Sequence, residues 1–547
     1  MHRSIAGLLL YIGIILSLAS CLGSVDDNSE RVFRYNESNG ITSLDPAYAR
    51  ELENLWVINQ MFDGLVELDS SLHVIPCIAR TWEISPDGKT YTFHLRTDVY
   101  FHRNDIFGVE GTRKVKPSDF IYSFKRIINP QTASPGKWIF TYLNQSIGDA
   151  GFNAPDDSTL IIHLSQSFQP FLGMLAMQYC NVVPEEAVLK YGAEFRSNPV
   201  GTGPFQFAFW YENEALVMHK NPKYWETDSI GNQLPYLDAI HIDFVKDMSA
   251  EFHGLLQGKY DFMSGINAAT KDELLDPLGE LNSTHTSTLR LQKTPFIKTD
   301  YIGFLCDPNS DAVQNSVVRD KRIRQAISYA IDKKSMIRHL RNNAVFPAEN
   351  GFVPPSLLGG QSYTYYPYDP IKASSLLEEA GYPGGKGLPE IEISVISDQT
   401  DLIEYIQHSL GQVGIPVRIN SMQGTAFKEK TANAQLMSFK KSWVADYADA
   451  ENFLGIFLSR NFCPAGPNYM HFSNPEYDLL YEKAASETTD SMRNELYHDM
   501  NRMIMEEAAV IPLFYDQVTH FVRNEVRGLQ TNPINMLDLK RVSKIQL

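Results

Sequence analysis

Apolar residues along the chain follow two different spacings, which predict helices in some segments and strands in others. In residues 115–130 they recur at helical spacing, and a proline stands near each end (Pro117, Phe120, Ile121, Phe124, Ile127, Ile128 and Pro130). Residues 322–340 repeat the helical spacing through a series of isoleucines. Residues 89–101 alternate apolar and polar positions, as strands with one buried face do.

The segment between residues 369 and 422 predicts the most complete set of elements. Asp369 and Pro370 suit the first turn of a helix, and Gly381 suits its end. A strand, a helix and a second strand follow, at residues 391–396, 401–413 and 416–419. This βαβ order indicates a parallel sheet covered by helices, so we expect an α/β lobe in the second half of the chain. The first half is richer in strands and turns, and Gly201 and Gly203 predict a tight bend there.

The first thirty residues predict export and not a folded element. The apolar run from Ile5 to Ala19 is shorter than the roughly 20 residues that a membrane-spanning helix needs. Leu18-Ala-Ser-Cys21 resembles a bacterial lipobox, which implies cleavage before Cys21 and lipid attachment to its thiol. We therefore expect a lipoprotein signal peptide over 1–21 and a polar tether over 22–30. The alternatives are an uncleaved anchor helix and an ordinary signal peptide that ends in cysteine.

The length of 547 residues predicts two or three domains, because a single core of this size is unusual. The composition is that of a globular protein, with 43% hydrophobic and 21% charged residues. A net charge of −17 argues against nucleic acid as a partner. Four further cysteines are widely separated and lack zinc-site spacing, so disulfides and buried thiols both remain open (Cys77, Cys180, Cys306 and Cys463).

Motifs that would indicate catalysis do not fit their contexts. GYPGGKG at 381–387 follows a predicted helix and leads into a strand, which is the reverse of a phosphate-binding loop. Ser134 and Lys137 have the S-x-x-K spacing, but the proline and glycine between them disrupt the required helical turn. The sequence contains no G-x-S-x-G and no H-E-x-x-H. We therefore expect no catalytic residue, no metal site and no cofactor.

The stretch KKSWVADYADAENFL, from Lys440 to Leu454, sets an aromatic residue beside several carboxylates. Residues 440–445 read as a strand, so Trp443 and Asp446 lie where the strand turns into a helix. Asp449 suits the cap of that helix, and Glu451 suits its positive end. Ligands of open α/β sheets bind at such turns. The alternatives are a surface aspartate beside a core tryptophan, and an exported hydrolase that uses these carboxylates.

This stretch resembles the ligand-contact segment of the oligopeptide/dipeptide-binding family of ABC-transporter substrate-binding proteins, extracellular solute-binding family 5. Further blocks resemble the family in the same order along nearly the whole mature chain, namely 41–49, 61–69, 78–96, 115–135, 201–205, 220–226, 324–333 and 379–383. The resemblance implies an α/β fold of two lobes joined by a hinge, of class II, with a subdomain inserted in the first lobe. It also implies the limits of these parts: lobe I over 31–68, 199–292 and 512–547, the inserted subdomain over 69–198, and lobe II over 293–511.

The resemblance implies that Asp446 pairs with the α-ammonium of a peptide, because Trp443-Val-Ala-Asp446 matches the W-x-x-D spacing of peptide-binding members. Trp443 and Tyr447 would line the ligand, and Lys440 would face its carboxylate. The stretch Asn39-Gly40-Ile41 would offer main-chain groups from the other lobe.

The function implied is that of a monomeric, lipid-anchored, extracytoplasmic receptor that delivers oligopeptides to an ABC permease. A receptor of the same fold for a metal chelate, a glycan or another small molecule is the alternative.

Overall fold

The structure is a computed structural model that describes residues 31–545 apart from 267–269, 315 and 360–362. The predicted signal peptide, Cys21 and the tether lie outside these residues. Among the described residues, no helix combines the length and the apolar character needed to cross a membrane.

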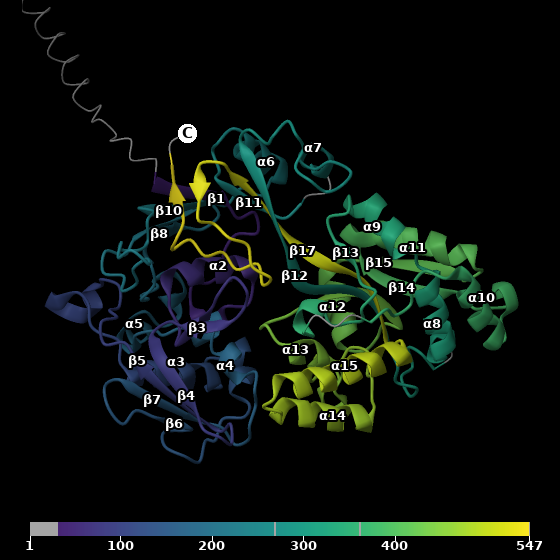
Figure 1. Cartoon of the computed structure of the whole chain (residues 1–547), viewed down its shortest axis with the longest axis horizontal. Helices are drawn as coiled ribbons and strands as arrows, with labels where there is room; N and C mark the ends of the chain where they lie inside the picture. Colours follow the sequence, from purple (N-terminus) through teal and green to yellow (C-terminus); the bar gives the residue numbers. More distant parts are fainter. Residues whose placement is uncertain (1–30, 267–269, 315, 360–362, 546–547) are drawn as a thin grey trace, which may run out of the picture.

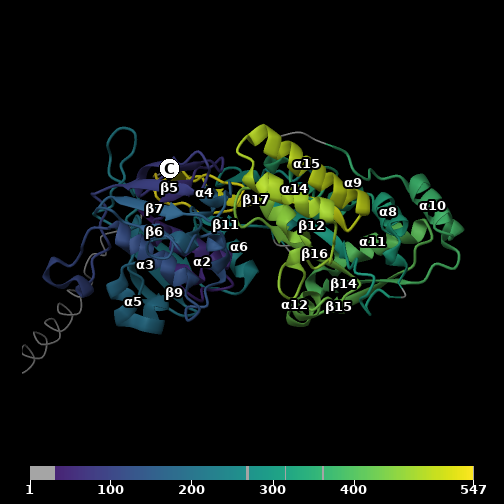
Figure 2. The same ribbon diagram turned by 90° about the horizontal axis from the view of Figure 1, so that it is seen from below.

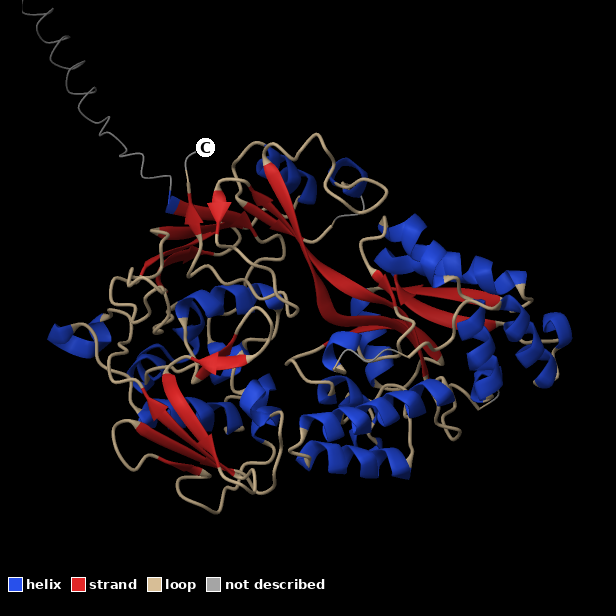
Figure 3. Ribbon diagram, in the orientation of Figure 1, coloured by secondary structure: helices blue, strands red, loops and turns tan. Residues whose placement is uncertain are grey.

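One long sheet joins the two halves of the protein, with the strand order β15-β14-β16-β12-β17-β11-β1-β10-β9-β8. Two of these strands, β12 (Leu289–Phe304) and β17 (Val510–Arg523), pass from one half into the other as an antiparallel pair (Figure 3). Their pairing is irregular between Pro295 and Thr299. The limits between the lobes that the family resemblance implies, at 292/293 and 511/512, lie on these two strands.

The second lobe contains the predicted βαβ unit. Strands β14 (Ile391–Ile396) and β15 (Val417–Met422) are parallel, with helix α11 (Thr400–Gln412) between them. Asp369 caps α10 (Pro370–Glu379) as predicted, since its side chain accepts from Lys372 N at 2.9 Å. The isoleucine-rich segment forms two helices, α8 (Lys321–Ala330) and α9 (Lys333–Arg341), because Asp332 caps a new helix at that point.

Among its described residues, the second lobe contains four further α-helices and two further strands of the long sheet. Figure 1 shows these helices beside β12 and β17. They and their neighbouring strands are α12 (Gly424–Ala432), β16 (Ser438–Val444), α13 (Glu451–Leu454), α14 (Pro475–Ser486), α15 (Asp490–Glu507) and the short β13 (Phe346–Pro347).

The first lobe is built on the other end of the long sheet. It contains β1 (Val32–Asn36), β8 (Phe205–Tyr211), β9 (Ala215–Lys220), β10 (Ala239–Asp243), β11 (Phe262–Ser264), and helices α2 (Leu52–Met61), α6 (Met248–Leu256) and α7 (Lys271–Leu274). The chain bends at Gly203 and Pro204, as the glycines predicted, and Gly201 and Gly203 have a second role. A Cβ atom on either would lie within 3 Å of the Met61 backbone, so the close approach of two chain segments requires glycine.

A separate four-stranded sheet, in the order β4-β5-β7-β6, extends the first lobe. Its strands are β4 (Ala79–Ile84), β5 (Thr90–Leu95), β6 (Phe152–Asn153) and β7 (Thr159–His163). Helices α3 (Pro117–Ile128), α4 (Phe171–Met174) and α5 (Glu185–Tyr191) pack around it, and the hairpin β2 (Val66–Leu68) and β3 (Val74–Pro76) precedes it. Helix α3 has the limits that its apolar spacing and two prolines predicted.

Candidate functional site

The predicted strand-to-helix turn is present, and Asn452 organises it. Strand β16 ends at Val444, and α13 begins at Glu451. The Asn452 side chain lies behind the turn and is only 8% exposed. Its Oδ1 accepts from Trp443 Nε1 at 3.1 Å and from Asp446 N at 3.2 Å, and its Nδ2 donates to Asp446 Oδ2 at 3.4 Å. One amide therefore fixes both the aromatic ring and the carboxylate that the sequence singled out.

Asp446 lies at the boundary between the lobes. Its side chain is exposed, so water reaches it on one side. Burial by the protein on its other sides raises its pKa, while the Asn452 hydrogen bond and the positive charge of Arg50 lower it. Arg50 belongs to the first lobe. Tyr179 is also in the first lobe, and its pKa is raised to about 12. Burial is the larger cause, and the negative charge of Asp446 is the second. The Asp446 carboxylate therefore faces the first lobe on one side and water on another.

Tyr447 lies next to Asp446 and makes a direct contact across the boundary. Its ring lies 5.7 Å from the ring of Trp138, centroid to centroid. Trp138 belongs to the segment that follows α3. A second contact joins the same parts, from Gln169 N to Ala485 O at 3.1 Å. The two lobes therefore touch one another on the side of the four-stranded sheet. Figure 2 shows α4 in the first lobe and α14 in the second.

Glu451 is a buried carboxylate and not the solvated helix cap that its sequence position suggested. It is 5% exposed, and the hydroxyls of Tyr447 and Tyr481 both donate to it. Burial raises its pKa to about 7. Asp449 Oδ1 accepts from Glu451 N, the first residue of α13, at 2.9 Å, but the residue that directly precedes the helix is Ala450 and not the predicted Asp449. Because Glu451 is held by two tyrosines and Asp446 by Asn452, the carboxylates do not form the shared pair that hydrolysis would require.

Lys440 lies on the opposite face of β16 from Trp443. Side chains alternate along a strand, and Lys440 and Trp443 are three residues apart. Lys440 is 4% exposed and forms an ion pair with Asp300. Its Nζ also contacts Gln399 Oε1 at 2.5 Å. The charge predicted to meet a ligand carboxylate is thus already neutralised inside the protein, and ligand contact by Lys440 stays a prediction that requires Asp300 to be displaced.

The stretch from Asn39 to Ile41 forms a turn in the first lobe, after β1. Gly40 has φ +72°, and its N–H donates to Glu37 O at 3.0 Å. Asn39 is exposed and its amide contacts Glu53, whereas Ile41 is buried. A hydrogen bond between this turn and a ligand stays a prediction.

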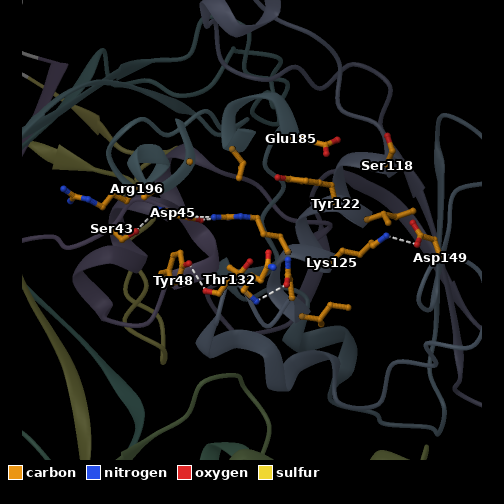
Figure 4. Close-up of a pocket in the computed structure, with 18 residues that line it drawn as sticks. Ser43, Asp45, Tyr48, Ser118, Tyr122, Lys125, Thr132, Asp149, Glu185 and Arg196 are labelled. Carbon is orange, nitrogen blue, oxygen red and sulfur yellow. Dashed lines mark hydrogen bonds and ion pairs between the residues drawn. The ribbon is translucent and has the colours of Figure 1, made fainter. Parts of the chain in front are cut away.

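A cavity lies within the first lobe, away from this turn. It has a volume of about 1090 Å³ and lies between α3, α5 and the loop before α2 (Figure 4). Its basic side chains are paired with acids: Arg126 with Asp45, Lys125 with Asp149, and Arg196 with Glu212. Within the described part of the chain, no cluster of metal-ligating side chains occurs.

The architecture and the turn define a class, that of two-lobe solute-binding proteins. The chain belongs to the bacterial extracellular solute-binding proteins, family 5, whose middle-region model matches residues 73–462. It is 26% identical to the dipeptide-binding protein of Escherichia coli K12 over 88% of this chain and 89% of that one. It is 28% identical to the E. coli K12 glutathione-binding protein GsiB over 97% of both chains.

A solved structure shows the same fold. The periplasmic binding protein DppA of Helicobacter pylori, in complex with the peptide STSA, has a TM-score of 0.75 and 24% identity. The match covers 94% of this chain and 98% of that one. The predicted family and the two-lobe fold are confirmed. The chain is a solute-binding protein of an ABC-transporter family and not an enzyme, and the family acts outside the cytoplasm.

Two residues of the candidate site escaped the sequence analysis. Asn452 lies six residues after Asp446, which is close enough for its amide to bond the carboxylate across a turn, and this spacing was the available signal. Nothing in the sequence predicts that Arg50 lies near Asp446, because the two residues come together only when the two lobes pack.

Proposed function

We propose that this protein captures peptides between its two lobes by binding their α-ammonium group at Asp446, and that it delivers them to an ABC permease. The observation that carries the proposal is the Asp446 carboxylate itself. It lies at the lobe boundary, its Oδ2 is held by Asn452 at 3.4 Å, and its pKa is raised by burial. A partly desolvated carboxylate favours a cationic partner, because an unpaired charge in such a position is costly.

Closure of the lobes would complete the site. Trp443 and Tyr447 would line the ligand beside Asp446, and the main chain of Asn39, Gly40 and Ile41 would contact it from the first lobe. The strands β12 and β17 would act as the hinge, since they are the elements that pass between the lobes. A ligand that touches both lobes stabilises the closed state by its difference in affinity for the two states. The proposed limits of the lobes remain those given by the family resemblance.

Export and lipid attachment at Cys21 complete the proposal. A lipid on Cys21 would hold the receptor at a membrane near its permease, and the polar residues 22–30 would separate it from the folded lobes. The support for this is the lipobox-like sequence before Cys21. We also propose that the receptor acts as a monomer.

Mass spectrometry of small molecules released from the natively purified protein tests the ligand class. We expect peptides with a free amino terminus. Replacing the carboxylate by an amide in Asp446→Asn should weaken binding of such peptides about 10- to 100-fold, the range for a hydrogen bond to a charged group. The thermal midpoint should not change, since Asp446 is exposed. Recovery of a ligand without an amine, together with unchanged affinity in Asp446→Asn, would contradict the proposal.

A further inference from the structure

The pairing of β12 with β17 is interrupted next to the turn between β16 and α13. Pro295 pairs with Gln517. The next pair along the two strands is Thr299 with Tyr515, so residues 296–298 of β12 stand opposite a single residue of β17. Such a β-bulge bends its strand and leaves the backbone pairing incomplete. Because β12 and β17 are the strands that pass between the lobes, a small bend at this bulge changes the angle between the lobes.

Ile297, in the middle of the bulge, joins that turn to the first lobe. Its C=O accepts from Ala445 N at 3.0 Å, and Ala445 belongs to the turn. Its N–H donates to Pro533 O at 2.9 Å. Pro533 lies in the C-terminal segment, which is bonded to α2 of the first lobe, since Trp56 Nε1 donates to Asn535 O at 2.7 Å. A single residue of β12 therefore holds the turn beside Asp446 on one side and the first lobe on the other.

An ion pair between side chains spans the same bulge. Lys298 Nζ lies 2.6 Å from Asp516 Oδ2 and 3.5 Å from Asp300 Oδ2. The other oxygen of Asp516 accepts from Gln517 N at 2.8 Å, which fixes the direction of the carboxylate. Burial lowers the pKa of Lys298, but the charges of Asp300 and Asp516 raise it by more, so the net direction is upward and the ammonium stays charged. A contact between charged side chains thus joins β12 to β17 where their backbones are not paired.

We propose that Lys298 and Asp516 are positioning residues for ligand binding. Their ion pair holds the bulge in the conformation in which the turn and the first lobe both bond Ile297, and it thereby sets how often the lobes are closed. This inference rests on the proposed function. In this conformation the lobes also touch through Trp138 and Tyr447. Without the ion pair the bulge bends more freely and the lobes open more often, so the apparent affinity falls in proportion to the closed population.

Hydrogen exchange of the ligand-free, full-length chain, measured by mass spectrometry, tests the inference in Asp516→Asn. The bonds at the bulge protect the amides of Ile297 and Ala445, so their exchange rates rise with the population of the open bulge. We expect exchange to become about 3- to 10-fold faster in segments 296–299 and 444–446, between the values for an exposed ion pair and for a hydrogen bond to a charged group. Strand β14, away from the bulge, should exchange at an unchanged rate.

Isothermal titration with one peptide that has a free amino terminus should show an affinity loss of the same 3- to 10-fold size in Asp516→Asn. Lys298→Arg keeps the charge and should retain both the affinity and the slow exchange. Lys298→Gln should resemble Asp516→Asn, and the double variant should lose less than the sum of the two, because both substitutions remove one contact.

Glu525→Gln is the matched control. It removes the pair of Arg523 with Glu525, which has the same 2.6 Å separation and a similar exposure at the first-lobe end of β17. This variant should leave the exchange of segments 296–299 and 444–446 and the affinity unchanged. Thermal melts of all the variants establish that each is folded.

The outcomes separate the inference from the proposed function. Unchanged exchange at the bulge in Asp516→Asn would overturn the inference, and so would faster exchange throughout the chain, which would mean that the pair only stabilises the fold. An affinity loss in Lys298→Gln without one in Asp516→Asn would also overturn it, because Lys298 would then act without its partner. In each case the peptide receptor stands. If the unmodified protein binds no peptide, the proposed function fails together with the role in affinity, and the exchange rates still decide whether the pair holds the bulge.

Discussion

The side-chain amide of Asn452 holds the carboxylate of Asp446, with Nδ2 at 3.4 Å from Oδ2. The Asn452 Oδ1 at the same time accepts from the Trp443 indole at 3.1 Å. Asn452 is itself placed by the start of α13, where its backbone N–H donates to Asp449 O at 3.2 Å. The ring and the carboxylate are therefore set relative to each other before a ligand arrives, which lowers the ordering cost of binding.

Replacing Asn452 by leucine should weaken the binding of peptides with a free amino terminus about tenfold, the lower end of the range for a charged hydrogen bond. The substitution keeps the side-chain size but removes the bonds to Trp443 and Asp446. Isothermal titration with free and N-acetylated forms of one peptide measures the effect. Asn433→Leu, at the exposed position directly after α12, is the control. An unchanged ratio between the two peptide forms would show that Asn452 does not position Asp446.

Lys440 should matter for stability and not for affinity. Lys440→Met removes the partner of Asp300, a carboxylate that is 3% exposed and keeps Lys298 at 3.5 Å. Breaking a buried ion pair by removing one partner costs about 3–5 kcal/mol, and we expect about 3 kcal/mol here because Lys298 remains. Denaturant unfolding measures this loss. A fall in affinity for free-carboxyl peptides without a loss of stability would instead assign Lys440 the ligand contact that its sequence position predicted.

Sequence features that act over a few residues predicted the helices and strands nearby. The two prolines around α3, the Asp369 cap and the apolar blocks of the βαβ unit act within a few residues, so the sequence carries them directly. The single helix expected over 322–340 is two helices, because Asp332 caps the second one. The W-x-x-D spacing located the turn between β16 and α13.

Side chains that meet across the fold could not be predicted in this way. The position of Lys440 depends on Asp300 of β12, which is 140 residues away. The contact of Trp138 with Tyr447 joins segments that are even further apart along the chain. Likewise, Glu451 reads as an ordinary first-turn carboxylate, and only the packing of Tyr481 against it shows that it is buried.

Glu451 should make the folded state less stable as the pH rises. Its pKa in the folded protein is about 7, compared with 4.5 for a free glutamate side chain. The folded state therefore binds the proton more tightly, and stability falls as the pH rises from about 4.5 to about 7. The contribution is on the order of a few kcal/mol. Glu451→Gln cannot ionise and should flatten this part of the stability profile, as measured by denaturant unfolding at pH values across that window. A slope equal to that of the unmodified protein would show that Glu451 is ionised in the folded state at low pH.

Trp138 should contribute to ligand affinity without touching the ligand, because its ring packs on Tyr447 across the lobe boundary. An aromatic pair of this kind is worth about 0.5–1.5 kcal/mol beyond its burial. Since apparent affinity is proportional to the population of the binding-competent state, Trp138→Ala should weaken peptide binding about 2- to 12-fold.

Small-angle scattering should show a larger radius of gyration for Trp138→Ala than for the unmodified protein, both with and without peptide, because the lobes lose a contact that holds them together. Tyr211→Ala is the matched control, since Tyr211 is an aromatic residue that is 60% exposed at the far edge of the first lobe. It should leave both the affinity and the scattering unchanged. Equal affinity and equal dimensions for Trp138→Ala would mean that the Trp138–Tyr447 contact does not bias the lobes toward closure, and the role of closing the lobes would then fall on β12, β17 and the ligand alone.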